Sequence, residues 1–524
     1  MINNMKSISG STKHVPPEGG WGWMTVLSVV ICNIAAVPPM TFFGFIFKGI
    51  SDELHLPMMQ IALIITTNIS LGLILNVIIV PIIKKNTSCR RKIGFVGAIM
   101  VVLSYIGVAY SQQLLHVILS FSICMAIGVK FITTASNETM KSYFVKTRRK
   151  VNKITLLSTA LGAIIMAQLM AYLLTVLNSR LTMLIISGVS LSLILAALFL
   201  SNVKFHLVEE IIDQEMETFV VPNHENNDGI KNGNSENKSR VNGIHKLTTS
   251  NDKIDKNEVK SLINSKNKYI IVPSRNINGK DKNFDIANIS LSQENVEDTK
   301  KGEPKRRNIY VKLLTNPLYV CVAIGVILNT LAESLFGALL PFMLFQFKFS
   351  AMDVGTGIAC FATAMVVMKY VAVYFRPKKN IPPRIVCILA IVFLIAARVG
   401  ISLGFLSNYR NLLTAAIVIG SAKGFLLGYI EETITEIIPP EEEDHAMNII
   451  NFTSGILLFI IGPAAGYSRD FTGKYQTVML GINGLNSAVI LLWTIQLLLS
   501  ACIELCKVTR NYHGRNSQNN NVTS

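Results

Sequence analysis

The chain has 524 residues, of which 50% are hydrophobic and only 15% are charged. A soluble protein usually carries about 25% charged residues, so this composition excludes an ordinary soluble domain. The formal net charge of +17 would suit nucleic acid, but the positive residues gather in short loops between apolar runs. Because those runs are long enough to cross a bilayer as helices, we predict a polytopic membrane protein.

The first apolar run follows the stretch 16–23, which reads Pro-Pro-Glu-Gly-Gly-Trp-Gly-Trp. Tryptophans at the start of a membrane helix suit the membrane–water interface. The glycines allow a tight turn before the helix. We predict a first helix over 21–47, bent at Pro38 and Pro39 because proline removes a backbone donor.

Five more apolar runs complete a first half and six form a second half. The loops 84–92 and 141–153 are rich in Lys and Arg, which places them in the cytoplasm by the positive-inside rule. The predicted helices span 57–83, 93–110, 114–139, 154–177 and 181–200, then 316–345, 352–375, 383–406, 412–438, 446–467 and 475–505.

Residues 204–312 are polar and poor in aromatic residues, a composition that cannot bury a core, and we predict a disordered linker. Six helices, a long polar connection and six helices is the layout of the major facilitator fold, an all-α membrane architecture of two six-helix halves. The expected parts are a tail (1–20), a bundle (21–203), the linker, a bundle (313–505) and a tail (506–524), with linker and both termini cytoplasmic.

The order of residues after the N-terminal prolines resembles the first-helix signature of the monocarboxylate transporter family. The stretch 141–149 resembles the family's Tyr-Phe-x-x-Arg-Arg entrance to helix 5, and Arg180 stands where the family has Arg in a Trp-Arg-Gly element. Further positions that carry the resemblance are Glu18, Gly19, Gly20, Trp21, Gly22 and Trp23, then Glu432 and Thr433, and finally Gly462, Pro463, Gly466, Asp470, Gly473, Lys474 and Tyr475.

The resemblance implies a plasma-membrane carrier of small monocarboxylates or related organic anions that works by alternating access. It also implies a single-span glycoprotein chaperone as a partner. By family position we expect gating or conformational roles at Arg148, Arg149, Arg180, Glu432 and Asp470. Glu432 would latch helix ends against Arg148 or Arg149.

The chain departs from the proton-coupled members of that family. They carry a lysine near the end of helix 1, where this chain has Met40 and Thr41. They also carry an Asp and an Arg one turn apart on helix 8, and those positions fall on Met365 and Lys369. The position of the family's Arg thus still carries a cation, Lys369, but the position of its Asp carries no carboxylate. The transport mechanism is therefore either proton symport or facilitated diffusion.

Ionisable residues inside predicted membrane helices are functional candidates because each is costly to insert. A surplus of deep cations suits a carboxylate substrate, since a desolvated carboxylate needs a positive partner. The candidate substrate-binding residues are Lys130, Lys369, Arg398 and Lys423, and the deep acid is Glu333.

Each of these residues also has a structural explanation. Lys369 could extend its amine to the interface, and Lys130 or Arg398 could pair with Glu333. Glu333 itself is either a proton acceptor or the structural partner of a lysine. Lys423 falls where the family has a bulky aromatic that shapes the substrate pocket.

Two other classes of function stay open: a carrier of amino acids or other small organic solutes by facilitated diffusion, and a non-transporting receptor or scaffold. The sequence has no metalloprotease, nucleophile-elbow or phosphate-loop motif, and we expect no enzyme activity. We also expect no cofactor, no metal site and no nucleic-acid partner.

Overall fold

The computed structural model describes residues 12–15, 18–145, 147–201, 208–211, 309–374, 382–403, 408–439 and 441–520. Side chains are described for all of these except 12–15, 149, 208–211 and 503–520. Nearly all of the predicted linker therefore lies outside the described residues. The regular secondary structure of the described chain is helical apart from a short antiparallel ribbon that pairs β1 (Thr12–Val15) with β2 (Val208–Ile211).

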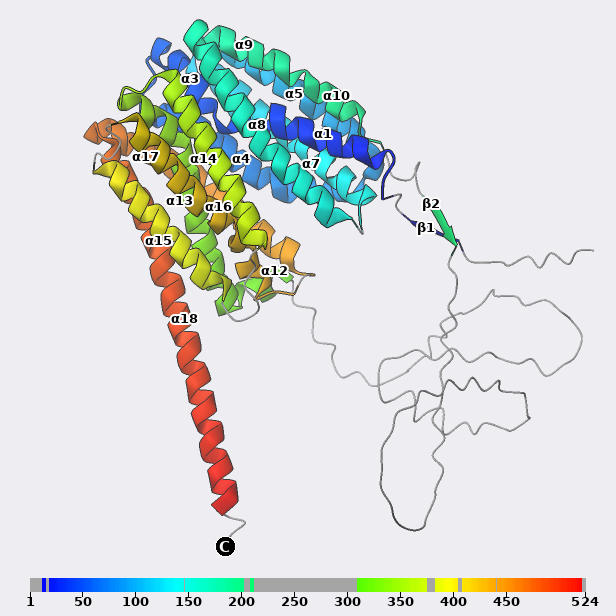
Figure 1. Cartoon of the computed structure of the whole chain (residues 1–524), viewed down its shortest axis with the longest axis vertical. Coiled ribbons are helices and arrows are strands. Elements are labelled where there is room, and N and C mark those ends of the chain that lie inside the picture. The colour runs from blue at the N-terminus through cyan, green and yellow to red at the C-terminus, as the bar shows by residue number, and fades with distance from the viewer. Residues whose placement is uncertain are drawn as a thin grey trace, which may run out of the picture. The chain divides into compact units, whose positions relative to one another are not determined.

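Twelve helical segments of the described chain are long and apolar enough to cross a membrane, as predicted. Figure 1 shows these helices as one bundle, with α18 extending beyond it. The first half contains α1 (Gly22–Ala35), α2 (Val37–Thr41), α3 (Phe43–Glu53), α4 (Met58–Lys85), η1 (Thr87–Cys89), α5 (Arg90–Ala109), α6 (Leu114–Val117), η2 (Ile118–Met125), α7 (Ala126–Tyr143), α8 (Arg148–Val176), α9 (Ser179–Ser190) and α10 (Ser192–Leu198).

The second half begins with a short helix and continues with six long ones. These are α12 (Ile309–Leu314), α13 (Pro317–Gln346), α14 (Ala351–Tyr374), α15 (Pro383–Ser402), α16 (Tyr409–Thr435), α17 (Glu443–Thr472) and α18 (Tyr475–Asn520). Four boundaries differ from the prediction by five residues or more. The helix α8 begins six residues early, at Arg148, and α3 ends six residues late, at Glu53. The helix α17 ends five residues late, at Thr472, and α18 continues past 505 into the predicted tail.

The first span is broken twice, where a single bend was predicted. α1 ends at Ala35, α2 covers five residues, and α3 starts at Phe43. Pro38 and Pro39 have no N–H, so the carbonyls four residues earlier lose their helical donors. Membrane proteins tolerate such irregular backbone where it is buried in protein or faces a cavity.

Glycines bring pairs of helices into backbone contact. A Cβ on Gly424 of α16 would lie 2.0 Å from the carbonyl oxygen of Met365 on α14, and one on Gly420 would lie 2.3 Å from that of Phe361. A Cβ on Gly462 of α17 would lie 2.1 Å from Oγ1 of Thr66 on α4. Small residues allow the close packing that associates helices in a bilayer.

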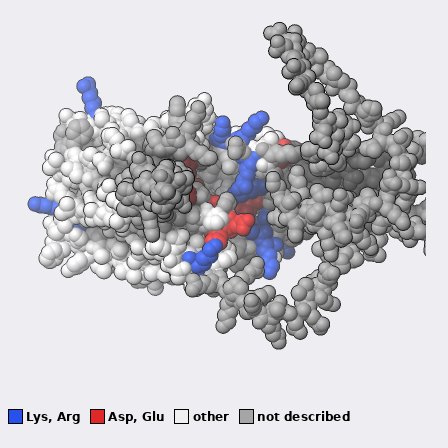
Figure 2. Space-filling view, turned by 90° about the horizontal axis from the view of Figure 1, so that it is seen from below, with Lys and Arg blue, Asp and Glu red and all other residues white. Residues whose placement is uncertain are grey.

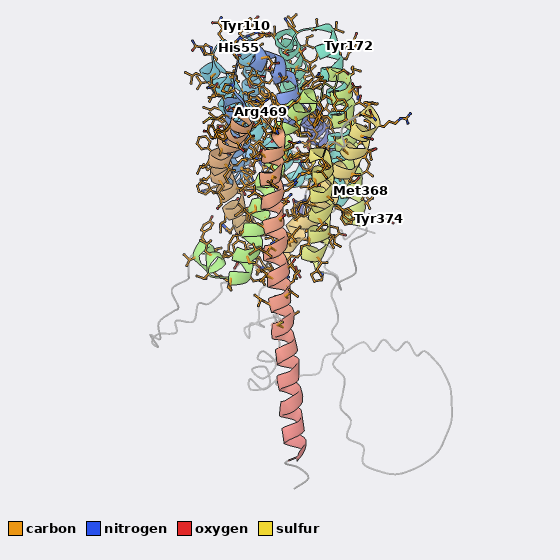
Figure 3. The ribbon with its side chains drawn as sticks, turned by 90° about the vertical axis from the view of Figure 1, so that its left-hand side faces the viewer. His55, Tyr110, Tyr172, Met368, Tyr374 and Arg469 are labelled. Carbon is orange, nitrogen blue, oxygen red and sulfur yellow. The ribbon has the colours of Figure 1, made fainter. Side chains whose placement is uncertain are left out.

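We name the two ends of the bundle by its first span: the Trp21 end, where α1 begins, and the Glu53 end, where α3 finishes. Figure 3 places His55 and Tyr110 at the Glu53 end and Tyr374 toward the other. The halves meet tightly at the Glu53 end, where Phe45 stacks on Phe345 with ring centroids 5.8 Å apart.

Candidate functional site

A cavity of about 790 Å³ lies between the two halves, toward the Trp21 end. Tyr374, one of its lining residues, is 72% exposed, so the cavity opens to the surface there. Most lining residues carry polar groups, and they come from four spans: Val29 and Asn33 of α1, Asn137 of α7, Asn152, Lys153, Thr155, Leu156 and Thr159 of α8, and Lys369, Tyr370, Val373 and Tyr374 of α14.

Lys369 lies in this cavity, on the last turns of α14. The described residues give its amine no hydrogen bond and no ion pair, so it is a free cation. Lys153 faces the cavity from α8, with Nζ 5.9 Å from the centre of the Tyr370 ring. The cavity therefore has cations on two opposing helices, one from each half, and no described carboxylate lines it.

Asn33 fixes the wall between α1 and α8. Its Nδ2 donates to the carbonyl oxygen of Thr155 at 3.0 Å and to Oγ of Ser158 at 2.9 Å. One turn further along α8, Gly162 lets the two backbones approach, since a Cβ there would lie 2.4 Å from the Asn33 carbonyl oxygen. The amide oxygen of Asn33 keeps its acceptor capacity for a ligand.

Three predicted candidates form one buried ion cluster in the second half. Arg398 Nη2 of α15 lies 2.5 Å from Glu333 Oε1 of α13, and Lys423 Nζ of α16 lies 3.3 Å from Glu333 Oε2. The Arg398 side chain is 0% exposed, and its guanidinium carbon lies 4.2 Å from the centre of the Phe336 ring. Glu333 is thus the shared partner of two cations.

Lys423 lies about one helical turn deeper than Lys369. The close contact of Gly424 with Met365 sets Lys423 level with Met365, and Lys369 follows Met365 by one turn toward the Trp21 end. Lys423 does not line the cavity, and its side chain is 19% exposed. It is tied to Glu333 and is not a free cation like Lys369.

Lys130 lies in α7, two turns before the cavity residue Asn137 and on the same helix face. It is partly buried and does not line the cavity. The described residues offer it no ion pair. Of the two cations expected as partners of Glu333, Arg398 makes the pair, and Lys423 joins it.

The N-terminal signature packs against the stretch that leads into α8. The Glu18 carboxylate accepts hydrogen bonds from the backbone N–H of Val145 at 2.8 Å and of Thr147 at 3.0 Å, just before α8 begins. A Cβ on Gly22 would lie 2.9 Å from the Phe144 ring, and Trp23 meets the same ring edge to face.

The neighbouring residues of that signature add further contacts between α1 and the rest of the first half. Gly20 has a φ of +55°, a left-handed conformation that favours glycine, and Gly19 accepts a backbone hydrogen bond from Gly22 at 3.0 Å. Trp21 Nε1 donates to the carbonyl oxygen of Phe199, beyond α10, at 3.3 Å. The signature therefore ties α1 to α8 and to the end of the sixth span.

Asp470 joins the two halves at the Glu53 end. Its carboxylate accepts hydrogen bonds from the backbone N–H of Met58 at 3.0 Å and of Met59 at 2.8 Å, so it caps the first turn of α4 from α17. Gly473, with a φ of +67°, then ends α17 in a left-handed cap.

Arg180 makes all of its described contacts within the first half. Its Nε lies 2.7 Å from Glu53 Oε2, and its Nη1 donates to the carbonyl oxygens of Ala109 and Ser111 at 2.8 Å. Arg148 is exposed at the start of α8. The side chain of Arg149 lies outside the described residues, so the latch with Glu432 stays a prediction.

Sequence reasoning missed most of the cavity wall. Lys153 was assigned to a cytoplasmic loop, although it lies in the second turn of α8. Asn33 and Asn137 carried a usable signal, since amide side chains are uncommon in apolar spans and tend to find polar surroundings, whereas Asn152 fell in the same predicted loop as Lys153.

Comparison with known proteins agrees with this architecture. The model of the Major Facilitator Superfamily matches residues 29–235 and 322–506, most of both halves. The solved structure of nucleoside transporter NupG superposes with a TM-score of 0.60 at 11% identity, covering 91% of this chain and 99% of that one. A bacterial homologue of the human lysosomal transporter Spinster, solved inward-facing and unoccupied, gives 0.56 at 10% identity over 91% and 96% of the two chains.

The sequence relatives match shorter segments. Monocarboxylate transporter 10 of Mus musculus is 26% identical over 32% of this chain and 33% of its own length. Monocarboxylate transporter 14 of Homo sapiens is 25% identical over 34% and 35%, and monocarboxylate transporter 13 of Bos taurus is 24% identical over 34% and 42%. The aligned parts therefore span about a third to two fifths of these relatives. The chain belongs to the Major Facilitator Superfamily of membrane transporters and is a divergent, monocarboxylate-transporter-like member of it.

Proposed function

We propose that this transporter carries small organic anions, monocarboxylates among them, by alternating access. The observation that carries the proposal is the free cation Lys369 in a cavity between the two halves. A carboxylate that enters such a site exchanges water for a charge-assisted hydrogen bond to the amine. The volume of about 790 Å³ also admits substrates larger than three-carbon acids.

We infer that the Trp21 end faces the cytoplasm and that the carrier lies in the plasma membrane. The basic stretches 84–92 and 141–153, which join α4 to α5 and α7 to α8, both lie at this end, and positive residues near helix ends are retained on the cytoplasmic side. Figure 2, viewed from the side toward which α18 extends, shows most of the visible Lys and Arg gathered with Asp and Glu in one zone, with isolated basic side chains toward the left edge. A glycoprotein chaperone stays an expectation of the family resemblance.

We expect facilitated diffusion rather than proton symport. A coupling carboxylate has to alternate between protonated and ionised forms during the cycle. Both carboxylate oxygens of Glu333 are already within ion-pair distance of a cation, Oε1 with Arg398 and Oε2 with Lys423. Glu333 also lies outside the cavity lining. An inward proton gradient should therefore leave uptake unchanged.

A second candidate cargo is a zwitterionic or neutral solute such as an amino acid. The three amides of Asn33, Asn137 and Asn152 favour it, because amides can donate to and accept from a polar solute. Neutral cargo would not need the free amine of Lys369. The effect of removing that amine on the uptake of each substrate distinguishes anionic cargo from neutral cargo.

The test is uptake of radiolabelled pyruvate, lactate and a panel of amino acids into proteoliposomes, with and without a proton gradient. Lys369→Gln should weaken anion uptake at least tenfold, since a hydrogen bond to a charged group contributes about 1.5–3 kcal/mol. Arg410→Gln, which removes an exposed cation at the Glu53 end, is the matched control. Equal anion uptake by both variants would refute the role of Lys369.

A further inference from the structure

A second cavity, of about 220 Å³, lies at the Trp21 end of the first half, away from the substrate cavity. It is formed where η1 and the start of α5 meet α7 and the end of α10. Its lining is two arginines, four hydroxyl residues and one apolar residue: Arg90, Arg91, Thr87, Ser88, Thr139, Ser201 and Leu200. No described carboxylate lines it.

Arg90 is held rigidly in this wall. Its Nε donates to the carbonyl oxygen of Ile83 at 3.1 Å, and its Nη1 donates to the carbonyl oxygen of Glu138 at 3.1 Å and to Oγ of Ser142 at 2.6 Å. The residue is 8% exposed, and within the described residues its Nη2 has no hydrogen bond. The Glu138 carboxylate pairs instead with Lys141 at 2.7 Å.

The second guanidinium, that of Arg91, lies at the open side of the cavity wall. Arg91 is exposed and has no ion pair within the described residues. Two guanidiniums and several hydroxyls around a small cavity suit a phosphate, because the planar fork of arginine matches phosphate oxygens in pairs. The rigid Arg90 would position the group and Arg91 would cover it.

The cavity lies at the depth of lipid headgroups. Trp21 donates to the carbonyl of Phe199, immediately before the cavity residues Leu200 and Ser201, and tryptophan rings favour the membrane interface. Toward the bilayer, the contacting helices α5 and α10 expose apolar side chains that acyl chains could cover. These are Phe95, Val96, Ile99, Leu195 and Leu198.

We propose that this cavity binds the phosphate of an anionic phospholipid, whose acyl chains lie along α5 and α10. A basic pocket at the cytoplasmic ends of membrane helices is a known kind of site for anionic headgroups. The apolar strip beside the cavity favours a lipid over a soluble phosphate, which would need only the polar lining.

The test measures the affinity of the purified full chain for fluorescent phosphatidylserine in detergent, with phosphatidylcholine as the zwitterionic comparison. Arg91→Ala should weaken phosphatidylserine binding about tenfold or more, through loss of a paired contact to phosphate. The matched control is Lys92→Ala, which removes the same charge one residue further on, at an exposed side chain outside the cavity lining. Loss of the Lys92 charge should weaken binding clearly less, because an exposed charge that does not contact the ligand is screened by water and salt.

Arg91→Lys separates geometry from charge, since it keeps the cation and loses the fork. The expected result is that Arg91→Lys also loses affinity and that inorganic phosphate does not displace the lipid. Equal effects of Arg91→Ala and Lys92→Ala, or full affinity of Arg91→Lys, would show general surface attraction and overturn the site. Displacement by inorganic phosphate at matched concentration would show a soluble-phosphate site and overturn the lipid.

Discussion

The buried ion cluster predicts a large loss of stability when its single acid is neutralised. Glu333→Gln keeps the size of the side chain and removes the charge that Arg398 and Lys423 share. Arg398 is 0% exposed and cannot reach solvent, so it becomes an uncompensated buried cation. Breaking a buried pair in this way typically costs about 3–5 kcal/mol.

The matched control is the same substitution in an exposed pair. Glu53 pairs with Arg180 at 2.7 Å, but the two side chains are 47% and 30% exposed. An exposed ion pair contributes about 0–1 kcal/mol, so Glu53→Gln should lower the melting temperature far less. Thermal unfolding in detergent, followed with a thiol-reactive dye that reports the buried cysteines, compares the two variants directly.

A double substitution tests whether the loss of stability comes from the unpaired buried charge of Arg398. Glu333→Leu with Arg398→Leu removes both buried charges, and apolar replacement of such pairs is often neutral or stabilising. The double variant should therefore melt above Glu333→Gln. The reasoning is refuted if Glu333→Gln melts together with Glu53→Gln, or if the double variant melts no higher than Glu333→Gln.

Two further predictions concern contacts between helices. Asp470→Ala removes the cap of α4 and should destabilise the conformation that is closed at the Glu53 end by about 1–2 kcal/mol. Distances between spin labels placed on the two halves at that end should then become longer. The control Lys84→Ala breaks an exposed ion pair and should change those distances little. Gly424→Leu should abolish folding or transport, because even its Cβ would lie 2.0 Å from the Met365 carbonyl oxygen. The control Gly337→Leu meets open space and should leave both folding and transport intact. Expression level and substrate uptake measure the two effects.

Much of the fold follows from hydropathy, because a bilayer fixes how long an apolar helix must be. All twelve spans could be predicted, and the pairing of Glu333 with a deep cation follows from the cost of an unpaired buried charge. The sequence could not predict which two cations would pair with Glu333. Arg398 and Lys423 reach Glu333 from two other helices, and no sequence spacing encodes that meeting.

The cavity wall was harder to predict for a different reason. Lys153 belongs to a run of basic residues that the positive-inside rule assigns to a loop. The rule gives sidedness and does not say where a helix starts, and α8 begins at Arg148. The double break at Pro38 and Pro39 was likewise underestimated, since proline predicts a lost donor but not how the neighbouring helices accommodate it.

The contacts at the two ends of the bundle differ in kind, and this difference indicates how a substrate could drive the cycle. At the Glu53 end, Asp470 caps a backbone across the halves. At the other end, the pair Lys84–Asp444 is 42% and 79% exposed and contributes little. Lys153 and Lys369 line the cavity from opposite halves, so closing it would bring two cations that repel each other nearer together.

A ligand shifts a conformational balance only by its differential affinity for the two states. An anion between Lys153 and Lys369 converts their repulsion into two attractions, and it binds more strongly as α8 and α14 approach. A neutral solute leaves the repulsion in place. The proposed anionic cargo would therefore itself supply the free energy that closes the Trp21 end.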